Sequence, residues 1–199
     1  MKELTLDLNK RYSFADYLTW LDDKRRELFD GFIKIMTPAP SSFHQEVSIE
    51  IASEFRNFLK KRKCKVFHAP FDVRLPNDGK TSDNEIYTVV QPDISIICDL
   101  SKIDKRGCMG APDLIVEIVS LNSKRDIEDK FQLYEKHGVK EYWIVYPHEK
   151  AISVFVLENK KFRLEGMFAE SGKVKVNIFE DLFIDIEEIF SCADDYKDF

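Results

Sequence analysis

The sequence has no run of ~18 apolar residues, the length that a membrane-spanning helix needs. Its first 14 residues, MKELTLDLNKRYSF, lack the continuous apolar segment of a secretory signal. There is also no internal repeat, no linker between domains and no low-complexity tract. These absences predict a cytoplasmic protein that does not insert into a membrane.

Cysteine is scarce, with four residues in the whole chain. None belongs to a CxxC pair, and none has zinc-type spacing to one of the four histidines. In a cytoplasmic protein this favours reduced thiols with a structural role. The four residues are Cys64, Cys98, Cys108 and Cys192.

Positive charge is not in excess, since the net charge is -6. Residues 179–199 hold eight acidic side chains and one lysine, so this C-terminal part carries -7 and the rest of the chain carries +1. The body of the protein is therefore nearly neutral. Its charge neither excludes nor indicates a nucleic acid partner.

What the sequence does have is apolar material for a core: 44% hydrophobic residues, including 16 Phe. A chain of 199 residues should bury roughly 70% of its unfolded surface without needing disulfides or metals. We predict one domain over residues 1–199, with its core at about 12–190 and a frayed acidic tail at 191–199.

Hydrophobic periodicity predicts an α/β protein. An amphipathic helix should follow Ser13, and Asp30-Gly31 should close a hairpin. A capping box at Ser42 and Gln45 should begin a second helix. Strands are expected at 67–75, 86–99, 113–120 and 141–147, a connector at 100–112, a helix at 124–137, a hairpin at 151–168 and a short helix within 179–190.

The helix after Ser42 carries two polar features of interest. His44 falls in the middle of its apolar stripe and should face the protein body, either as a core histidine bonded to a neighbour or as a site residue. The helix ends in a basic group, which is either a solvated helix end or a phosphate contact. This group is Lys60, Lys61, Arg62, Lys63 and Lys65.

Three further charges lie at positions where burial is expected. Asp93 and Glu117 fall within apolar, β-branched strands, and Lys130 falls within the apolar arc of the helix at 124–137. Burying such charges is costly unless they are paired or bind a metal. Lys130 could simply pair with Asp126 one turn earlier. The sharper hypothesis joins Asp93, Glu117 and Lys130 in one hydrolytic site.

Phosphodiester hydrolysis suits these residue types. Two carboxylates with a backbone carbonyl can hold Mg²⁺ or Mn²⁺, which neutralises the phosphate and activates water. A neighbouring ammonium can orient that water or stabilise the transition state. We therefore expect Asp93 and Glu117 to be metal ligands, and Lys130 to act beside them.

Several linked motifs resemble the Uma-two family of restriction-endonuclease-type proteins, which are similar to the PD-(D/E)xK nucleases. They are ELFDG, the start of the His44 helix, APFDVRLP, VVQPDISIICD, GAPDLIVEIVS, the spacing of Arg125, Asp126 and Lys130, and GVKEYWIVYP, all between Glu27 and Leu157. The resemblance implies a restriction-endonuclease-like mixed central sheet flanked by helices.

The same resemblance assigns roles to residues. Asp93 becomes the PD aspartate and Glu117 the second carboxylate. The superfamily lysine would stand at Val119, so its role passes to Lys130. Glu27 and His44 become accessory catalytic candidates.

Three functions remain open. The first is a Mg²⁺- or Mn²⁺-dependent endonuclease acting on DNA, which by analogy should be a homodimer. The second is a catalytically silent nuclease-like fold that binds nucleic acid or protein. The third is a metal-dependent hydrolase of another phosphoester.

Overall fold

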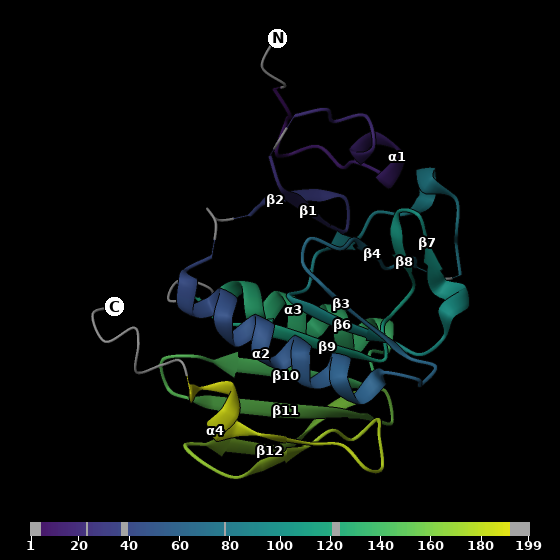
Figure 1. Ribbon diagram of the computed structural model, residues 1–199. Coiled ribbons are helices and arrows are strands. Elements are labelled where there is room, and N and C mark those ends of the chain that lie inside the picture. Colours follow the sequence, from purple (N-terminus) through teal and green to yellow (C-terminus); the bar gives the residue numbers. More distant parts are fainter. Residues whose placement is uncertain (1–4, 23, 37–39, 78, 121–123, 192–199) are drawn as a thin grey trace.

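The computed structural model describes residues 5–22, 24–36, 40–77, 79–120 and 124–191, without the side chains of residues 124–126. A six-stranded sheet in the order β12-β11-β10-β9-β6-β3 forms its centre (Figure 1). β9 and β10 are parallel and the other neighbours antiparallel, so the predicted mixed sheet is confirmed. The strands are β3 Lys65–His68, β6 Ile94–Ile97, β9 Leu114–Ile118, β10 Glu141–Tyr146, β11 Ala151–Glu158 and β12 Lys161–Ala169.

A second six-stranded sheet, in the order β2-β1-β5-β4-β8-β7, lies beyond the β3 end of the central sheet (Figure 1). Its strands are β1 Arg26–Phe29, β2 Phe32–Ile35, β4 Val73–Arg74, β5 Val89–Val90, β7 Ile103–Asp104 and β8 Gly107–Met109. A separate pair joins β13 Lys173–Lys175 to β14 Phe183–Asp185. We call the two large sheets the central sheet and the upper sheet.

Helices α2 Ser42–Leu59 and α3 Lys124–His137 cover opposite faces of the central sheet, and the short α4 Ile186–Ile189 lies on the α2 side (Figure 1). The short α1 Phe14–Tyr17 packs against the upper sheet, and the 3-10 turns are η1 Asp83–Glu85 and η2 Leu100–Lys102. Alternate residues of β9 face opposite ways: Val116 packs in the core under α2, and Ile115 packs in the core under α3. Among the described residues, no helix combines the length and the apolarity that crossing a membrane requires.

Most local predictions are confirmed. Asp30 and Gly31 both have positive φ, 49° and 87°, as a tight hairpin turn between β1 and β2 requires. Asn159 and Lys160 turn the β11–β12 hairpin in the same way, with φ of 50° and 66°. Gly138 ends α3 at φ 82°, and α3 carries the chain from β9 to its parallel neighbour β10.

Two predicted helices need correction, one in its length and one in its start. Ser13 caps α1 as predicted, but α1 is only four residues long, and Leu21, which a longer amphipathic helix would bury, is 91% exposed. The cap of α2 is Ser41 and not Ser42, because the Ser41 hydroxyl accepts the backbone N–H of His44. Propensity alone does not decide which of two adjacent serines takes the extended backbone of a cap.

Two predicted strands each divide between the sheets. The segment 67–75 leaves the central sheet after β3 at Pro70, which has no N–H for the ladder, and enters the upper sheet as β4. The segment 86–99 runs from β5 of the upper sheet to β6 of the central sheet, so Asp93 lies just before β6 and not inside a strand. The predicted connector at 100–112 contains the β7–β8 hairpin.

The prediction of reduced thiols is wrong for one pair, because Cys64 and Cys98 form a disulfide. The register of β3 and β6 pairs Lys65 with Ile97, so the next positions outward face each other across the two strands. Only the register reveals this proximity, since 34 residues separate the cysteines in sequence. Cys108 is free, and burial raises the pKa of its thiol to about 11. Cys192 lies outside the described residues.

One residue of the basic group at the end of α2, Arg62, makes contacts that stabilise the fold. Arg62 pairs with Asp181 at 2.7 Å and lies over the ring of Phe58. This supports the structural interpretation for Arg62. Phosphate contact by the neighbouring lysines stays a prediction, as does the division of the chain into one domain and a tail.

Candidate active site

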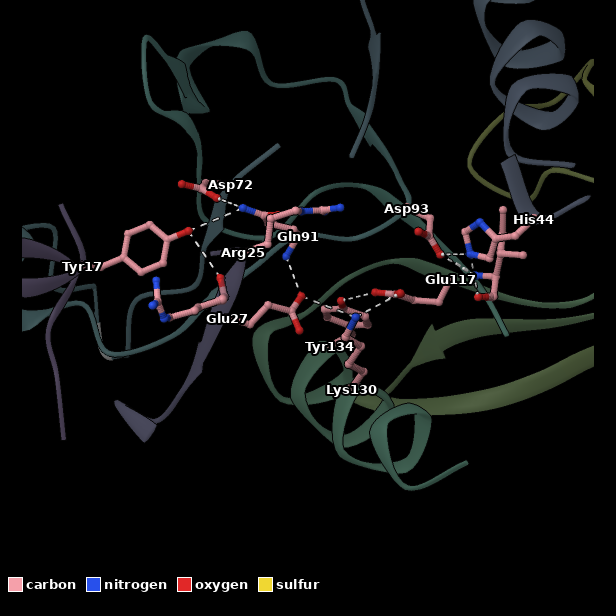
Figure 2. Close-up of polar contacts among 12 residues, drawn as sticks. Tyr17, Arg25, Glu27, His44, Asp72, Gln91, Asp93, Glu117, Lys130 and Tyr134 are labelled. Atoms are coloured by element: carbon pink, nitrogen blue, oxygen red, sulfur yellow. Dashed lines mark hydrogen bonds and ion pairs between the residues drawn. The ribbon is translucent and has the colours of Figure 1, made fainter. Parts of the chain in front are cut away.

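Glu117 is a charged residue in the middle of a fully buried strand. Its side chain is 9% exposed and points from β9 toward α3 (Figure 2). Glu117 Oε2 accepts a hydrogen bond from Lys130 Nζ at 3.1 Å, and Oε1 accepts one from the Tyr134 hydroxyl at 2.6 Å. Lys130 and Tyr134 are four residues apart on α3, so both reach the same carboxylate.

The upper sheet supplies a second carboxylate. Glu27 on β1 is 3% exposed, and its Oε1 lies 3.5 Å from Lys130 Nζ. The same oxygen accepts the backbone N–H of Gln91 at 2.7 Å, which holds Glu27 toward the central sheet. Lys130 thus lies between one acid from each sheet. We call Glu27, Glu117, Lys130 and Tyr134 the lysine network.

Burial, and to a lesser extent the neighbouring charges, strongly perturbs the pKa of Glu117. Burial raises the pKa of its carboxyl to about 8, Lys130 opposes the rise, and the negative charges of Asp93 and Glu27 add to it. Burial, together with Glu117, also holds the pKa of Tyr134 well above its ordinary value, so the phenol remains a donor. A strongly perturbed carboxyl with a specific charge partner is typical of a functional site.

Asp93 and His44 lie beside the network (Figure 2). Ile94 pairs with Val116, so Asp93 and Glu117 are the next residues outward from that pair. Asp93 Oδ2 accepts the backbone N–H of Ile118 at 2.8 Å and lies 3.5 Å from His44 Nε2.

The imidazole of His44 also contacts the strand that carries Glu117. His44 Nε2 lies 3.1 Å from the carbonyl oxygen of Ile118. His44 Nδ1 is buried and has no hydrogen-bond partner among the described residues. His44 therefore faces the body of the protein as predicted, and it contacts both Asp93 and β9.

The donors near Asp93 suit a hard divalent cation. Asp93 Oδ2 and the Ile118 carbonyl oxygen both lie within 3.5 Å of His44 Nε2, so two oxygen donors converge on one region. Glu117 is the adjacent residue on β9. In the part of the chain that the structure describes, no three His, Cys, Asp or Glu side chains gather as a metal cage. A cation here would depend on two carboxylates, one backbone carbonyl and water, which fits Mg²⁺.

The structure gathers the five residues singled out from the sequence into two adjoining groups. Glu27, Glu117 and Lys130 meet in the lysine network, and Asp93 and His44 contact each other beside it. The alternative pairing of Lys130 with Asp126 involves a side chain outside the described residues.

Sequence reasoning missed two polar participants. Tyr134 falls in the apolar arc of the helix at 124–137, which by itself predicts a core residue, although its spacing of four from Lys130 places both on one face. Gln91, which holds Glu27 through its backbone, has no signal in the sequence beyond its place next to Pro92.

Comparisons with known proteins agree with this architecture. The model of the Uma2 family, described as "Putative restriction endonuclease", matches residues 14–187. The fold is similar to the crystal structure of "a putative nuclease belonging to DUF820" from Anabaena variabilis ATCC 29413, with a TM-score of 0.71 and 21% identity. That match covers 90% of this chain and 98% of the other. Comparison with curated proteins gave no match. The predicted restriction-endonuclease-like fold is confirmed.

Proposed function

Because the chain belongs to the Uma2 family of restriction-endonuclease-like nucleases, we propose that it is a Mg²⁺- or Mn²⁺-dependent endonuclease that hydrolyses phosphodiester bonds of DNA. The observation that supports this most is the buried contact between Glu117 and Lys130 at 3.1 Å, with Asp93 on the facing segment. A buried pair of this kind is weak evidence for stability, since apolar residues would often serve as well. Its presence next to a second acid favours a chemical role.

The protein groups divide the work of hydrolysis. Asp93, Glu117 and the Ile118 carbonyl would hold the cation, which when bound neutralises phosphate charge and lowers the pKa of water. Lys130 would orient the attacking water or stabilise charge on the phosphoryl oxygens. Its ammonium is already positioned by Glu117 and Glu27 at 3.1 and 3.5 Å.

Two neighbours keep these groups in position. The hydroxyl of Tyr134 restricts the Glu117 carboxylate, leaving the other oxygen toward Lys130. The imidazole of His44 lies against Asp93 and β9 and limits the movement of the Asp93 carboxylate. Such supporting contacts lower the cost of organising a site during the reaction.

The cleavage experiment uses supercoiled plasmid, a duplex oligonucleotide and an RNA oligonucleotide, each with Mg²⁺, Mn²⁺ or EDTA. We expect metal-dependent cutting of DNA that falls by at least ~100-fold in Asp93→Ala and in Lys130→Met. Glu128→Gln, at an exposed position on α3, is the matched control and should cut at the wild-type rate. Undiminished cutting by Asp93→Ala would remove the site assignment.

One observation favours the alternative of a binding module without catalysis. Both oxygens of Glu117 already have protein partners, and the side chains of Glu117 and Lys130 are 9% and 6% exposed. Calorimetry separates the two functions. A working site should bind Mn²⁺ and lose that binding in Glu117→Ala. A silent fold should bind DNA with the same affinity whether or not metal is present.

We also propose that the protein is a homodimer, because cutting both strands of a duplex is simplest with two copies of one site. Light scattering with and without a duplex oligonucleotide tests this. A monomer under both conditions, together with cutting of one strand only, would contradict it.

A further inference from the structure

A pocket of about 430 Å³ adjoins the lysine network. Its walls come from the segment between β3 and β4, from Gln91 and from the β7–β8 turn. The residues used below are Phe71, Asp72, Gln91, Lys105, Arg106 and Gly107. A pocket of this size with a few convergent polar groups is typical of a small-ligand site.

Gln91 links this pocket to the candidate active site. Its side chain lines the pocket, while its backbone N–H donates to Glu27 Oε1, the oxygen that contacts Lys130. Figure 2 shows Asp72 and Gln91 on one side of Glu27, and Glu117 and Lys130 on the other. One residue therefore separates the two sites.

The polar wall of the pocket is held rigid. Gln91 Nε2 donates to Asp72 Oδ1 at 2.8 Å, and Gln91 Oε1 accepts from Arg25 Nε and Nη2 at 3.1 and 2.9 Å. These bonds fix which end of the Gln91 amide faces Asp72. Asp72 Oδ2 makes no hydrogen bond with the described residues, so it is available to a donor from a ligand.

The backbone around Asp72 is equally constrained. Its carbonyl oxygen accepts the N–H of Cys108 at 2.8 Å. Gly107 has φ +117°, and a Cβ there would meet that carbonyl oxygen at 2.0 Å. Only glycine allows the β7–β8 turn to lie this close to Asp72 and close the pocket.

The other walls are aromatic and charged, and their one acidic residue, Asp104, pairs with Arg74 at 2.7 Å. Phe71 lines the pocket and stacks on Phe67, with ring centroids 4.2 Å apart and planes 9° apart. Lys105 is exposed and makes no ion pair with the described residues, whereas Arg106 is held by Asp83 at 2.6 Å. A ligand could thus meet a flat apolar surface, a carboxylate oxygen and a cationic rim in one place.

We propose that this pocket binds a nucleobase carrying an exocyclic amino group, from an unstacked nucleotide next to the bond that is cut. The amino group would donate to Asp72 Oδ2, the base would lie against Phe71, and Lys105 would contact the attached phosphate. Thymine and uracil fit less well, because their pairing-edge N–H lies between two carbonyl oxygens that repel a carboxylate. The identification of this base as part of a cleaved nucleic acid rests on the proposed function. The binding of a base by the pocket does not depend on cleavage.

The test is calorimetric titration of the full chain, in EDTA, with dAMP, dGMP, dCMP and dTMP. We expect dTMP to bind about tenfold or more weakly than the best amino-bearing nucleotide, the discrimination typical of one good base contact. Asp72→Asn should abolish that preference, because an amide can donate to the thymine carbonyls. Lys105→Ala, an exposed change, should weaken all four nucleotides several-fold, while Lys173→Ala on β13 should not.

Equal affinity for the four nucleotides, absence of binding, or affinity unchanged in Lys105→Ala would overturn the proposal. Because Lys105 is exposed, its variant gives an answer even if Asp72→Asn fails to fold. Metal-dependent cleavage without base discrimination would reject base binding in the pocket and leave the proposed nuclease function standing. Base-selective binding without cleavage would reject the nuclease function and leave base binding standing.

Discussion

Replacing Glu117 with glutamine should stabilise the protein increasingly as the pH rises from acid to neutral. Burial raises the pKa of Glu117 from 4.5 to about 8, with Asp93 and Glu27 adding to the rise against the opposing effect of Lys130. Between these values the unfolded chain releases the Glu117 proton while the folded protein keeps it. The contribution of Glu117 to wild-type stability therefore falls with pH in this window, and an amide of the same shape has no proton to lose.

The magnitude follows from one proton. A difference of one bound proton changes the free energy of unfolding by about 1.4 kcal/mol per pH unit. The wild type should therefore lose roughly 3 kcal/mol relative to Glu117→Gln between pH 4.5 and 7. The amide also alters the hydrogen bonds that Glu117 makes with Lys130 and Tyr134, which shifts the variant's stability by a similar amount across this pH window. The test is therefore how the difference in unfolding free energy between variant and wild type changes with pH, and not the size of that difference at one pH.

The assay is urea unfolding at pH 5, 6, 7 and 8 in EDTA, followed by circular dichroism. Glu128→Gln, at an exposed position on the same helix, measures the effect of removing one acidic charge and is subtracted. Stability curves of wild type and Glu117→Gln that run parallel from pH 5 to 8 would refute the reasoning. They would mean that Glu117 is ionised in the folded protein throughout, with Lys130 dominating burial.

Three further changes test the supporting contacts. Tyr134→Phe should cost ~1–3 kcal/mol in urea unfolding, because one buried oxygen of Glu117 loses its donor; an unchanged midpoint would contradict the 2.6 Å bond. Gly107→Ala should cost more than ~2 kcal/mol, since the new Cβ meets the Asp72 carbonyl at a strained positive φ, and wild-type thermal stability would show that the turn adapts. Cys64→Ser should lower stability by about 2–4 kcal/mol without reductant and show no difference with it; four titratable thiols in unfolded, unreduced wild type, one for each cysteine of the chain, would reject the disulfide.

Much of the local structure could be predicted because it depends on neighbours in the chain. Alternation placed β9, the 3.6-residue period placed α3, and Gly138 placed its end. Glu117 and Lys130 could be singled out for the same reason, since a charge at a position that the pattern buries is conspicuous. The sequence also placed the β10 strand parallel to β9 through the length of the crossover.

The packing of the two sheets against each other, and the contacts that it creates, could not be predicted from local patterns. The pattern of residues 86–99 is continuous, and only the packing of two sheets divides it into β5 and β6 and leaves Asp93 at the border. The same packing brings Glu27 to Lys130 across more than a hundred residues of sequence. The facing of Cys64 and Cys98 likewise depends on the strand register.

The sequence by itself singled out Glu117 and Lys130 as charges at buried positions, because hydrophobic periodicity depends on neighbouring residues. The tertiary structure alone decided how they meet: a second carboxylate on Lys130, a phenol on Glu117 and a pocket beside them at Gln91. The physical reason is that hydrophobic patterning specifies which face of an element is buried, whereas the partner of that face depends on the packing of the whole chain.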